Sequence, residues 1–419
     1  MATLFYIAGK SAWNRRFTLF LVILSISLST ILLTGIERIR TQARLGFSQA
    51  ISGTDLVVGA RGSQIQLILY AVFHLGGATN NMGWDSAQRI AARPQVAWTI
   101  PLSMGDSHRG YPVVGTNSDF FTHFRYRRDT SVELAQGRLF GDIFEVVLGA
   151  EVARRLNYQP DQKIVLAHGG GEVTLLHADK PFTVVGILKP TGSPVDRSLY
   201  ISLESMEAIH IDWRGGAPIP GFSIDAENVR KFNLEPKAIT ALLVGLKNRR
   251  QVFNLQRTIQ EDRLEALSAV MPGVALDQLW HLLGNWETTL IIVSLLVTFT
   301  GLSGLSSTIL AGLGERRREL AILRASGASP RDIYCIMAIE GLIMTLIGII
   351  LGLVVLTIII ALVGPYLLNN YGLEIQIASP GLTEWLIILG ILVLGLLTSL
   401  IPAFRAYFLS LTDGLDPSV

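Results

Sequence analysis

Residues 314–364 read GERRRELAILRASGASPRDIYCIMAIEGLIMTLIGIILGLVVLTIIIALVG, and this stretch decides the fold class. Good helix formers fill residues 315–326, and Gly327 is the residue type that ends a helix in a left-handed cap. Ser329 can then cap a second helix, with Pro330 at its first position and Asp332 three residues after the cap. Because no charged side chain occurs from residue 341 to residue 373, this second helix is predicted to enter a membrane.

Two explanations fit the arginines that precede this span. In the first, the arginines act only as orientation signals, because cytoplasmic loops of membrane proteins are rich in Lys and Arg. Alternatively, the short basic helix docks onto a cytoplasmic partner and transmits motion to the membrane. The break between two capped helices favours docking, since an orientation signal needs only charges.

The composition indicates an integral membrane protein with a soluble part. Half of the 419 residues are hydrophobic and 16% are charged, against about a quarter charged in soluble domains. The apolar residues gather in four runs, which predict spans at residues 17–36, 288–313, 339–364 and 384–405. The first run is longer than the roughly 7–15 residues of a signal-peptide core, and no A-x-A cleavage site follows it. We therefore expect a retained first span, preceded by a cytoplasmic amphipathic segment at residues 1–16.

Residues 37–287 carry most of the charge and predict an α+β domain outside the membrane. Strands are expected at residues 55–58, 146–148, 163–166, 172–176, 182–188 and 241–246. Helices are expected at residues 149–156, 204–210 and 248–271. Residues 53–81 and 204–237 fit no pattern that predicts a role. The single cysteine, Cys335, excludes an internal disulfide, and no basic run suggests a nucleic-acid partner.

The distribution of basic residues predicts the orientation. The N-terminal segment holds three, which are Lys10, Arg15 and Arg16. The segment between the second and third spans, residues 314–338, holds Arg316, Arg317, Arg318, Arg324 and Arg331, whereas residues 365–383 hold none. The positive-inside rule therefore places both termini in the cytoplasm, including the tail at residues 406–419, and residues 37–287 on the other side. Arg38, Arg40 and Arg44 count against this orientation, but long domains translocate largely regardless of charge.

Several site classes find no support in the sequence. No G-x-x-x-x-G-K-[ST] loop is present, so the chain is not expected to hydrolyse ATP by itself, and Gly169–Gly171 is interpreted as a hairpin turn. We find no motif of a serine hydrolase or a zinc protease, and expect no catalytic residue, bound cofactor or metal ion. His168 and His177 can meet across the hairpin, but a surface role without metal is the expectation. The predicted spans hold no interior charge, which disfavours a conduction path across the bilayer.

The charged stretch resembles the signature segment of the FtsX-like permeases of the MacB superfamily of ABC transporters. The matching residues are Glu315, Arg316, Arg318, Glu319, Leu320, Ala321, Arg324, Gly327, Ala328, Ser329, Asp332, Ile333, Glu340 and Gly341. In that family the segment couples the permease to an ATPase subunit. The resemblance therefore implies seven candidate coupling residues, which are Glu315, Arg316, Arg318, Glu319, Arg324, Gly327 and Ser329.

The middle of the chain is similar to the periplasmic core of MacB-like permeases. The matching segments are residues 137–140, 147–156 and 182–188, followed by Asp196 and Tyr200. This similarity implies a porter-like fold with an inserted β-rich module near residues 130–203. The expected fold class is an α-helical membrane protein with four transmembrane helices and a large α+β extracytoplasmic domain.

The resemblance implies the permease subunit of an ABC transporter that works by mechanotransmission in the inner membrane. ATP and Mg would bind a separate ATPase dimer, and the work would be export or extraction of a periplasmic or membrane substrate. Further implied partners are a second permease copy or paralogue and a periplasmic adaptor or outer-membrane protein. The family's basic C-terminal tail is missing, since the chain ends DGLDPSV. The alternative is a membrane-anchored sensor or scaffold that regulates a periplasmic partner without transport.

Overall fold

The computed structural model describes residues 16–412 apart from 78–79, 128, 170–174, 215, 316–326, 372–374 and 376. The chain divides into two compact units. The first, which we call the helical unit, contains the described residues up to Ala43, Gly284–Leu367, and those from Ile375 onward. The second, the α+β unit, contains Arg44–Leu283 and the described residues of Leu368–Glu374. Each boundary at residues 43/44 and 283/284 falls inside a helix, so these helices contribute residues to both units.

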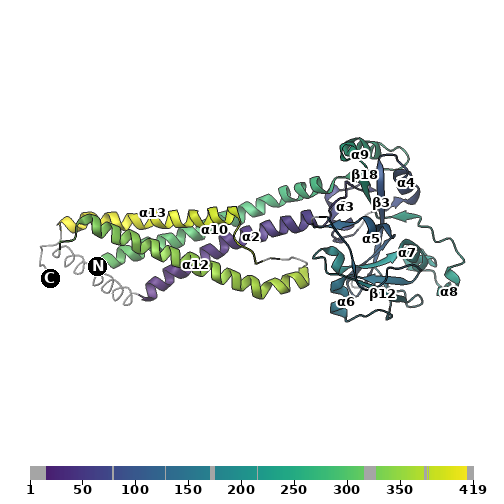
Figure 1. Cartoon of the computed structure of the whole chain (residues 1–419), viewed down its shortest axis with the longest axis horizontal. Coiled ribbons are helices and arrows are strands. Elements are labelled where there is room, and N and C mark those ends of the chain that lie inside the picture. Colours follow the sequence, from purple (N-terminus) through teal and green to yellow (C-terminus); the bar gives the residue numbers. More distant parts are fainter. Residues whose placement is uncertain are drawn as a thin grey trace. The chain divides into compact units, whose positions relative to one another are not determined.

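Four long helices supply the helical unit, and in Figure 1 they run along one another. They are α2 (Arg16–Gln49), α10 (Pro272–Glu315), α12 (Pro330–Tyr371) and α13 (Leu382–Thr412). The segments long and apolar enough to cross a membrane are Leu19–Gly46, Gly284–Ala311, Arg331–Leu367 and Leu382–Phe404. The helices extend past the predicted apolar runs. α2 continues to Gln49 through good helix formers such as Glu37 and Arg38, and α10 begins at Pro272, before its run.

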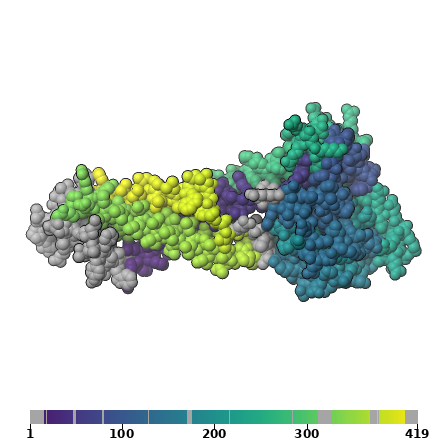
Figure 2. Space-filling model, viewed as in Figure 1, coloured from purple at the N-terminus to yellow at the C-terminus, as the bar shows by residue number. Residues whose placement is uncertain are grey.

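Small residues let these helices approach closely. A Cβ atom added to Gly348 of α12 would lie 2.7 Å from Cγ2 of Ile26 in α2, and one added to Gly352 would lie 2.8 Å from the backbone oxygen of Ser27. Gly341 faces Ser399 of α13 in the same way. Such contacts are typical of helices that pack inside lipid. α12 and α13 form much of the visible face of this unit in Figure 2.

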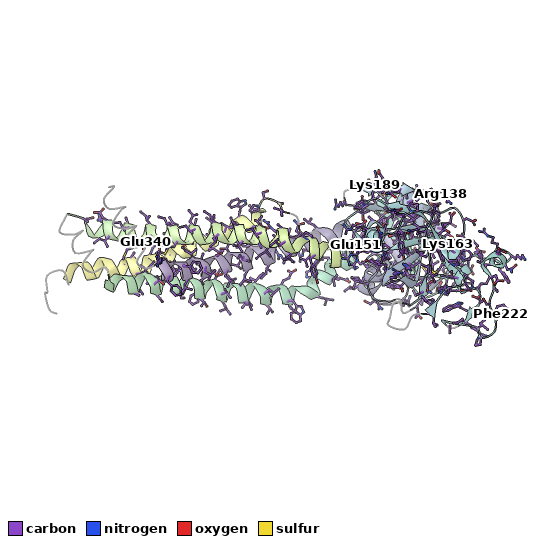
Figure 3. All side chains as sticks on the ribbon, turned by 90° about the horizontal axis from the view of Figure 1, so that it is seen from below. Arg138, Glu151, Lys163, Lys189, Phe222 and Glu340 are labelled. Atoms are coloured by element: carbon purple, nitrogen blue, oxygen red, sulfur yellow. The ribbon has the colours of Figure 1, made fainter. Side chains whose placement is uncertain are left out.

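The outward side chains of the helices are large and apolar. Phe299 is 72% exposed and Leu362 is 74% exposed, so both would face lipid once the helices cross a bilayer. Charged side chains are concentrated in the other unit. Figure 3 labels Arg138, Lys163 and Lys189 there, and Glu340 on α12.

The α+β unit is built around one long strand, β3 (Val96–His108), which takes part in two groups of strands. The first half of β3 pairs with β17, and the second half pairs with β4 and β10. The first group runs in the order β18 (Leu267–Val270), β1 (Leu56–Ala60), β17 (Ala241–Leu246) and β3. The second group continues from β3 through β4 (Tyr111–Thr116), β13 (Leu199–Ser202), β8 (Glu145–Leu148), β12 (Phe182–Leu188) and β7 (Leu134–Gly137).

Short elements complete this unit. The remaining strands are β2 (Met82–Gly83), β5 (Arg125–Tyr126), β6 (Thr130–Ser131), β9 (Lys163–Ile164), β10 (Ala167–His168), β11 (Leu175–Leu176), β14 (Trp213–Arg214), β15 (Ala217–Pro218) and β16 (Ala238–Ile239). The α-helices are α3 (Gln64–Ala71), α4 (Trp84–Ala91), α5 (Asp119–His123), α6 (Ala150–Leu156), α7 (Leu203–His210), α8 (Ala226–Val229) and α9 (Val252–Gln260). Two 3-10 turns are η1 (Pro194–Arg197) and η2 (Arg249–Gln251).

Separate apolar cores lie beneath the two strand groups. Leu56, Leu242 and Ile259 belong to the core of the first group, where α9 packs near β18. Val146, Phe182 and Ile209 belong to the core of the second group. A third core, which includes Ile100, Phe120 and Tyr200, draws residues from both groups.

The second strand group draws its strands from residues 103–202. This range is wider than the inserted module expected near residues 130–203, because β4 and the second half of β3 belong to the group.

The predicted strands at residues 182–188 and 241–246 are confirmed as β12 and β17. The predicted helix at residues 248–271 is wrong beyond Gln260, because the chain turns and residues 267–270 form β18. Leu267, Ala269 and Val270 are buried there while β18 pairs with β1. Burial and pairing in the sheet outweigh the helix propensity of the preceding Leu, Glu and Ala residues.

Candidate functional site

The candidate coupling residues lie between residues 315 and 329, which we call the coupling segment. The structure describes this segment only at its ends. Arg316, Arg318, Glu319 and Arg324 lie outside the described residues. Glu315 is the last residue of α10. Gly327 has φ +98°, a backbone conformation that favours glycine, and the next helix begins three residues later.

The start of α12 is set by a reciprocal cap. The backbone N–H and the hydroxyl of Ser329 each donate a hydrogen bond to Oδ2 of Asp332, at 2.7 Å in both cases. The backbone N–H of Asp332 donates in return to the Ser329 hydroxyl at 3.3 Å. Pro330 is the first residue of the helix, where its missing N–H costs nothing. The cap predicted from the sequence is thus confirmed, and α12 has a defined first turn directly after the coupling segment.

A buried ion pair lies in the helical unit between α2 and α13. Arg38 Nε donates to Glu384 Oε1 at 3.0 Å and Arg38 Nη2 donates to Oε2 at 2.6 Å. Both side chains are less than 10% exposed. Near it, Arg40 contacts Glu37 at 2.8 Å and Glu287 at 3.6 Å. Arg38 lies two residues after the first predicted span and Glu384 is the first residue of the fourth, so the pair joins the ends of two predicted spans and leaves their interiors uncharged. The opposite charges neutralise one another.

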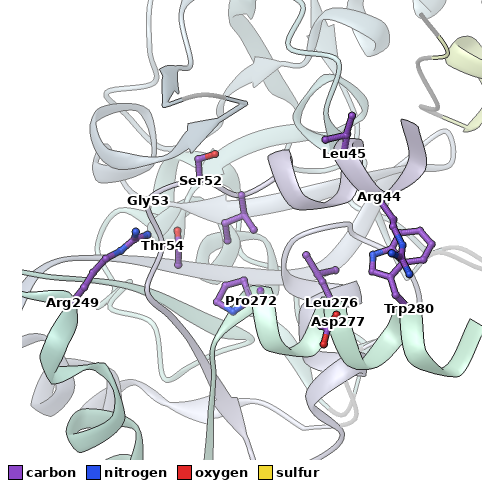
Figure 4. A pocket seen from close by; sticks show the side chains of 12 residues that line it. Arg44, Leu45, Ser52, Gly53, Thr54, Arg249, Pro272, Leu276, Asp277 and Trp280 are labelled. Atoms are coloured by element: carbon purple, nitrogen blue, oxygen red, sulfur yellow. The ribbon is translucent and has the colours of Figure 1, made fainter. Parts of the chain in front are cut away.

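The α+β unit contains a pocket of about 560 Å³ beside the last turns of α2 and the first turns of α10. Arg44 and Trp280 form one wall, with the guanidinium 5.3 Å from the centre of the indole ring (Figure 4). Arg249 and Asp277 also line the pocket. An open pocket with two arginines and an aromatic ring suits an amphiphilic or anionic ligand.

One cluster of titratable side chains stands apart from these features. Asp106 of β3, His168 of β10, His210 of α7 and His177 each offer a donor atom, and all four atoms lie within 4.8 Å of one another. Burial favours the neutral form of the Asp106 carboxyl, but the neighbouring imidazoles outweigh it and hold the pKa of Asp106 well below its usual range. His168 and His177 do meet, as the predicted hairpin allows, yet His177 is fully buried. Its expected surface role is therefore wrong.

Two features were not foreseen from the sequence. The Arg38–Glu384 pair joins residues 346 positions apart, and the sequence signal was a charge at or just beyond the end of two predicted spans. Of the histidine cluster, only His168 and His177 were close enough in sequence to be considered together.

Two family models match the chain. The model for the MacB-like periplasmic core domain matches residues 18–257, and the model for the FtsX-like permease C-terminal part matches residues 291–411. The second match begins in α10 and contains the described parts of the coupling segment.

Curated relatives point the same way. The chain is 24% identical over 286 residues to an uncharacterized ABC transporter permease of Methanocaldococcus jannaschii, which covers 66% of this chain and 63% of that protein. It is 24% identical over 214 residues to the lipoprotein-releasing system transmembrane protein LolC of Neisseria meningitidis serogroup B, which covers 50% of this chain and 46% of that protein. It is 23% identical over 270 residues to the macrolide export ATP-binding/permease protein MacB of Photorhabdus laumondii, which covers 63% of this chain and 38% of that protein. The chain thus spans less than two thirds of the length of each.

Proposed function

Because the chain belongs to the family of permeases with a MacB-like periplasmic core domain and an FtsX-like C-terminal part, we propose that it is the permease subunit of an ABC transporter. In this proposal the helical unit crosses the inner membrane and the α+β unit works on the periplasmic side. A separate ATPase dimer binds ATP and Mg and contacts the segment between α10 and α12. A second permease copy or paralogue completes the complex.

The observation that carries the proposal is the arrangement of helices on either side of the coupling segment. α10 starts at Pro272, in the α+β unit, and ends at Glu315, the first coupling residue. α12 starts at the Ser329–Asp332 cap and continues as a span. A partner that moves the segment therefore acts directly on the ends of two long helices. One of these helices, α10, includes residues 272–283 of the α+β unit.

The proposed work is mechanical. ATP binding closes the ATPase dimer, displaces the coupling segment, and shifts the helices that lead to the α+β unit. The work is export or extraction of a substrate on the periplasmic side, with a periplasmic adaptor or outer-membrane protein as a further partner. Both termini are cytoplasmic in this arrangement.

The proposal is tested on the full chain, isolated from its native membrane in mild detergent together with any ATPase bound to it. We expect an ABC ATPase to co-purify, and its activity to rise when the complex is placed in lipid. Arg324→Glu should reduce this stimulation at least tenfold, because it reverses one charge of the coupling segment. The matched control is Arg263→Glu, the same charge reversal at an exposed position of the α+β unit, which should leave stimulation unchanged. Recovery of no ATPase, or normal stimulation in the Arg324 variant, would contradict the proposal.

The pocket beside Arg44 and Trp280 favours a second candidate function, a membrane-anchored sensor or scaffold that binds a ligand without transport. Such a protein needs no ATPase. The same purification separates the two functions, since a sensor would be recovered without ATPase activity.

A further inference from the structure

We propose that Asp106, His168, His177 and His210 form a binding site for one divalent transition-metal ion of the Zn²⁺ class. The inference rests on the geometry of the four side chains within the second strand group. It is independent of the permease proposal, because none of the four belongs to the coupling segment.

The spacing of the donor atoms matches a tetrahedral site. Zinc binds imidazole nitrogen at about 2.0–2.1 Å, so neighbouring ligand atoms in a tetrahedron lie about 3.3–3.4 Å apart. His168 Nδ1 lies 2.9 Å from Asp106 Oδ1 and 3.0 Å from His210 Nε2. Oδ1 of Asp106 lies 3.4 Å from His210 Nε2 and 3.8 Å from His177 Nε2. These separations bracket the tetrahedral value, and all four donor atoms lie within 4.8 Å of one another. Asp106, His168 and His210 are therefore already close to tetrahedral spacing, and His177 would move toward them by up to about 1 Å to complete the site.

His177 shows why a metal explains the cluster better than hydrogen bonds do. Its side chain is completely buried, and within the described part of the chain neither ring nitrogen has a hydrogen-bond partner. The Asp106 Oδ2 atom is also buried without a partner among those residues. Buried polar groups left unpaired are costly, and native proteins rarely keep them. A bound cation would give His177 Nε2 a ligand bond and would offset the Asp106 charge.

The surroundings of the cluster resemble the outer shell of a metal site. His210 Nδ1 hydrogen-bonds to the backbone oxygen of Met206 at 2.9 Å, which places its proton there and leaves the Nε2 lone pair toward the other ligands. The Trp213 ring lies 4.3 Å from the His177 ring and 5.1 Å from the His168 ring, measured between ring centres. This apolar wall limits the access of water to the donor atoms.

The ligand set also selects the kind of ion. Three imidazoles and one carboxylate suit Zn²⁺ and similar transition metals, whereas Ca²⁺ and Mg²⁺ prefer oxygen ligands. Four protein ligands leave no open position, which is typical of structural rather than catalytic zinc. The ion would tie the β10–β11 hairpin and the end of α7 to β3. The proposed role is therefore to hold these parts of the second strand group together.

The test uses the full-length protein in detergent, without a polyhistidine tag, after removal of metal with a chelator. Co²⁺ serves as the spectroscopic probe and Zn²⁺ as the competitor. We expect one Co²⁺ per chain with the intense visible absorption of a tetrahedral ion, and its displacement by one equivalent of Zn²⁺. Mg²⁺ at a hundredfold excess should not displace Co²⁺.

Two single variants then locate the site. His168→Gln and His210→Gln change partly exposed ligands, and each should weaken Co²⁺ binding at least a hundredfold. The matched control is His281→Gln, because the His281 side chain is 81% exposed and lies on α10, outside the cluster. The control should bind Co²⁺ as the wild type does. Size-exclusion elution and the far-UV spectrum of each metal-free variant show whether it is folded.

The two measurements keep the inference falsifiable even if a variant fails to fold. A folded wild-type protein that binds less than a tenth of an equivalent of Co²⁺ and of Zn²⁺ would overturn it. Unchanged affinity in the folded His168 and His210 variants would overturn it as well, since the ion would then sit elsewhere. In either case the cluster would be a hydrogen-bonded network.

Discussion

Removing one partner of the Arg38–Glu384 ion pair should destabilise the helical unit by about 3 kcal/mol. The pair is bidentate, with contacts of 3.0 and 2.6 Å, and its side chains are only 8% and 9% exposed. Breaking a buried pair typically costs about 3–5 kcal/mol, because the remaining charge has no partner. Insertion of a lone charge at the centre of a membrane helix costs about 2.5–3.5 kcal/mol. The two ranges overlap at about 3–3.5 kcal/mol, and the position of Glu384 near a helix start favours the lower end of this overlap.

A double-mutant cycle on the full chain measures this contribution. The variants are Arg38→Met, Glu384→Met and the double substitution, and the observable is the free energy of unfolding in mixed micelles titrated with SDS. Each single variant should lose about 3 kcal/mol, whereas the double variant should remain within about 1 kcal/mol of the wild type, because apolar residues can replace a buried pair at little cost.

The control cycle uses Glu133 and Lys189, an ion pair of the α+β unit with a contact of 2.7 Å and side chains 58% and 56% exposed. An exposed pair of this kind should give a coupling energy far below that of the buried pair, because solvent screens the two charges. If the Arg38–Glu384 coupling were equally small, the reasoning from burial would be refuted.

Two further predictions concern separate parts of the chain. Burial lowers the pKa of His74 to about 4, against about 6.5 in an unfolded chain, so the unfolded state takes up a proton first as the pH falls. The difference in pKa therefore makes the free energy of unfolding depend on pH. The contribution of neutral His74 is fully present above pH 6.5 and is lost toward pH 4, by about 3 kcal/mol in all. Asparagine tolerates the positive φ of 55° at this position, so His74→Asn is a suitable variant. It should flatten the pH dependence of the thermal unfolding temperature of the full chain between pH 6.5 and pH 4. An unchanged slope would contradict the assignment of this pH dependence to His74. Gly352→Ala should cost about 1–3 kcal/mol, because the added Cβ would lie 2.8 Å from the Ser27 oxygen, whereas Gly390→Ala, with nothing within 4 Å, should be neutral in the same SDS titration.

Features that depend on neighbouring residues could be predicted from the sequence. The cap of α12 follows from Ser329, Pro330 and Asp332, which all lie within four residues of one another. The spans follow from uninterrupted apolar runs, and β12 and β17 from short apolar segments bounded by turns. In each case the conformation that the local sequence favours is the one found in the structure, so no distant contact was needed to predict the element.

Features that depend on distant contacts could not be predicted. β3 joins the two strand groups, yet its sequence VAWTIPLSMGDSH contains a proline, a glycine and several polar residues that argue against a central strand. Pro101 can occupy it because it lies where the ladder changes partner: β17 pairs with β3 up to Leu102, and pairing with β4 begins at Ser103. The Pro101 oxygen accepts a hydrogen bond from Thr116. The histidine cluster has the same origin, since Asp106 lies 62 residues from His168 and reaches it only through the pairing of β3 with β10.

The arginines at the end of α2 show how a distant contact changes the interpretation of a local signal. A count of basic residues treats Arg38 and Arg40 as free charges and sets them against the proposed orientation. In the structure Arg38 is paired with Glu384, and Arg40 contacts Glu37 and Glu287. Pairing lets these arginines lie at the end of a span without an unpaired charge, although the positive-inside rule counts Lys and Arg whether or not they are paired. The prediction that follows concerns topology: Glu384→Gln leaves Arg38 unpaired but changes no basic residue, so the fraction of chains with the α+β unit inside, measured by protease protection of vesicles, should equal that of the wild type. A rise in that fraction would show that the pairing of Arg38, and not the count of basic residues alone, sets the orientation.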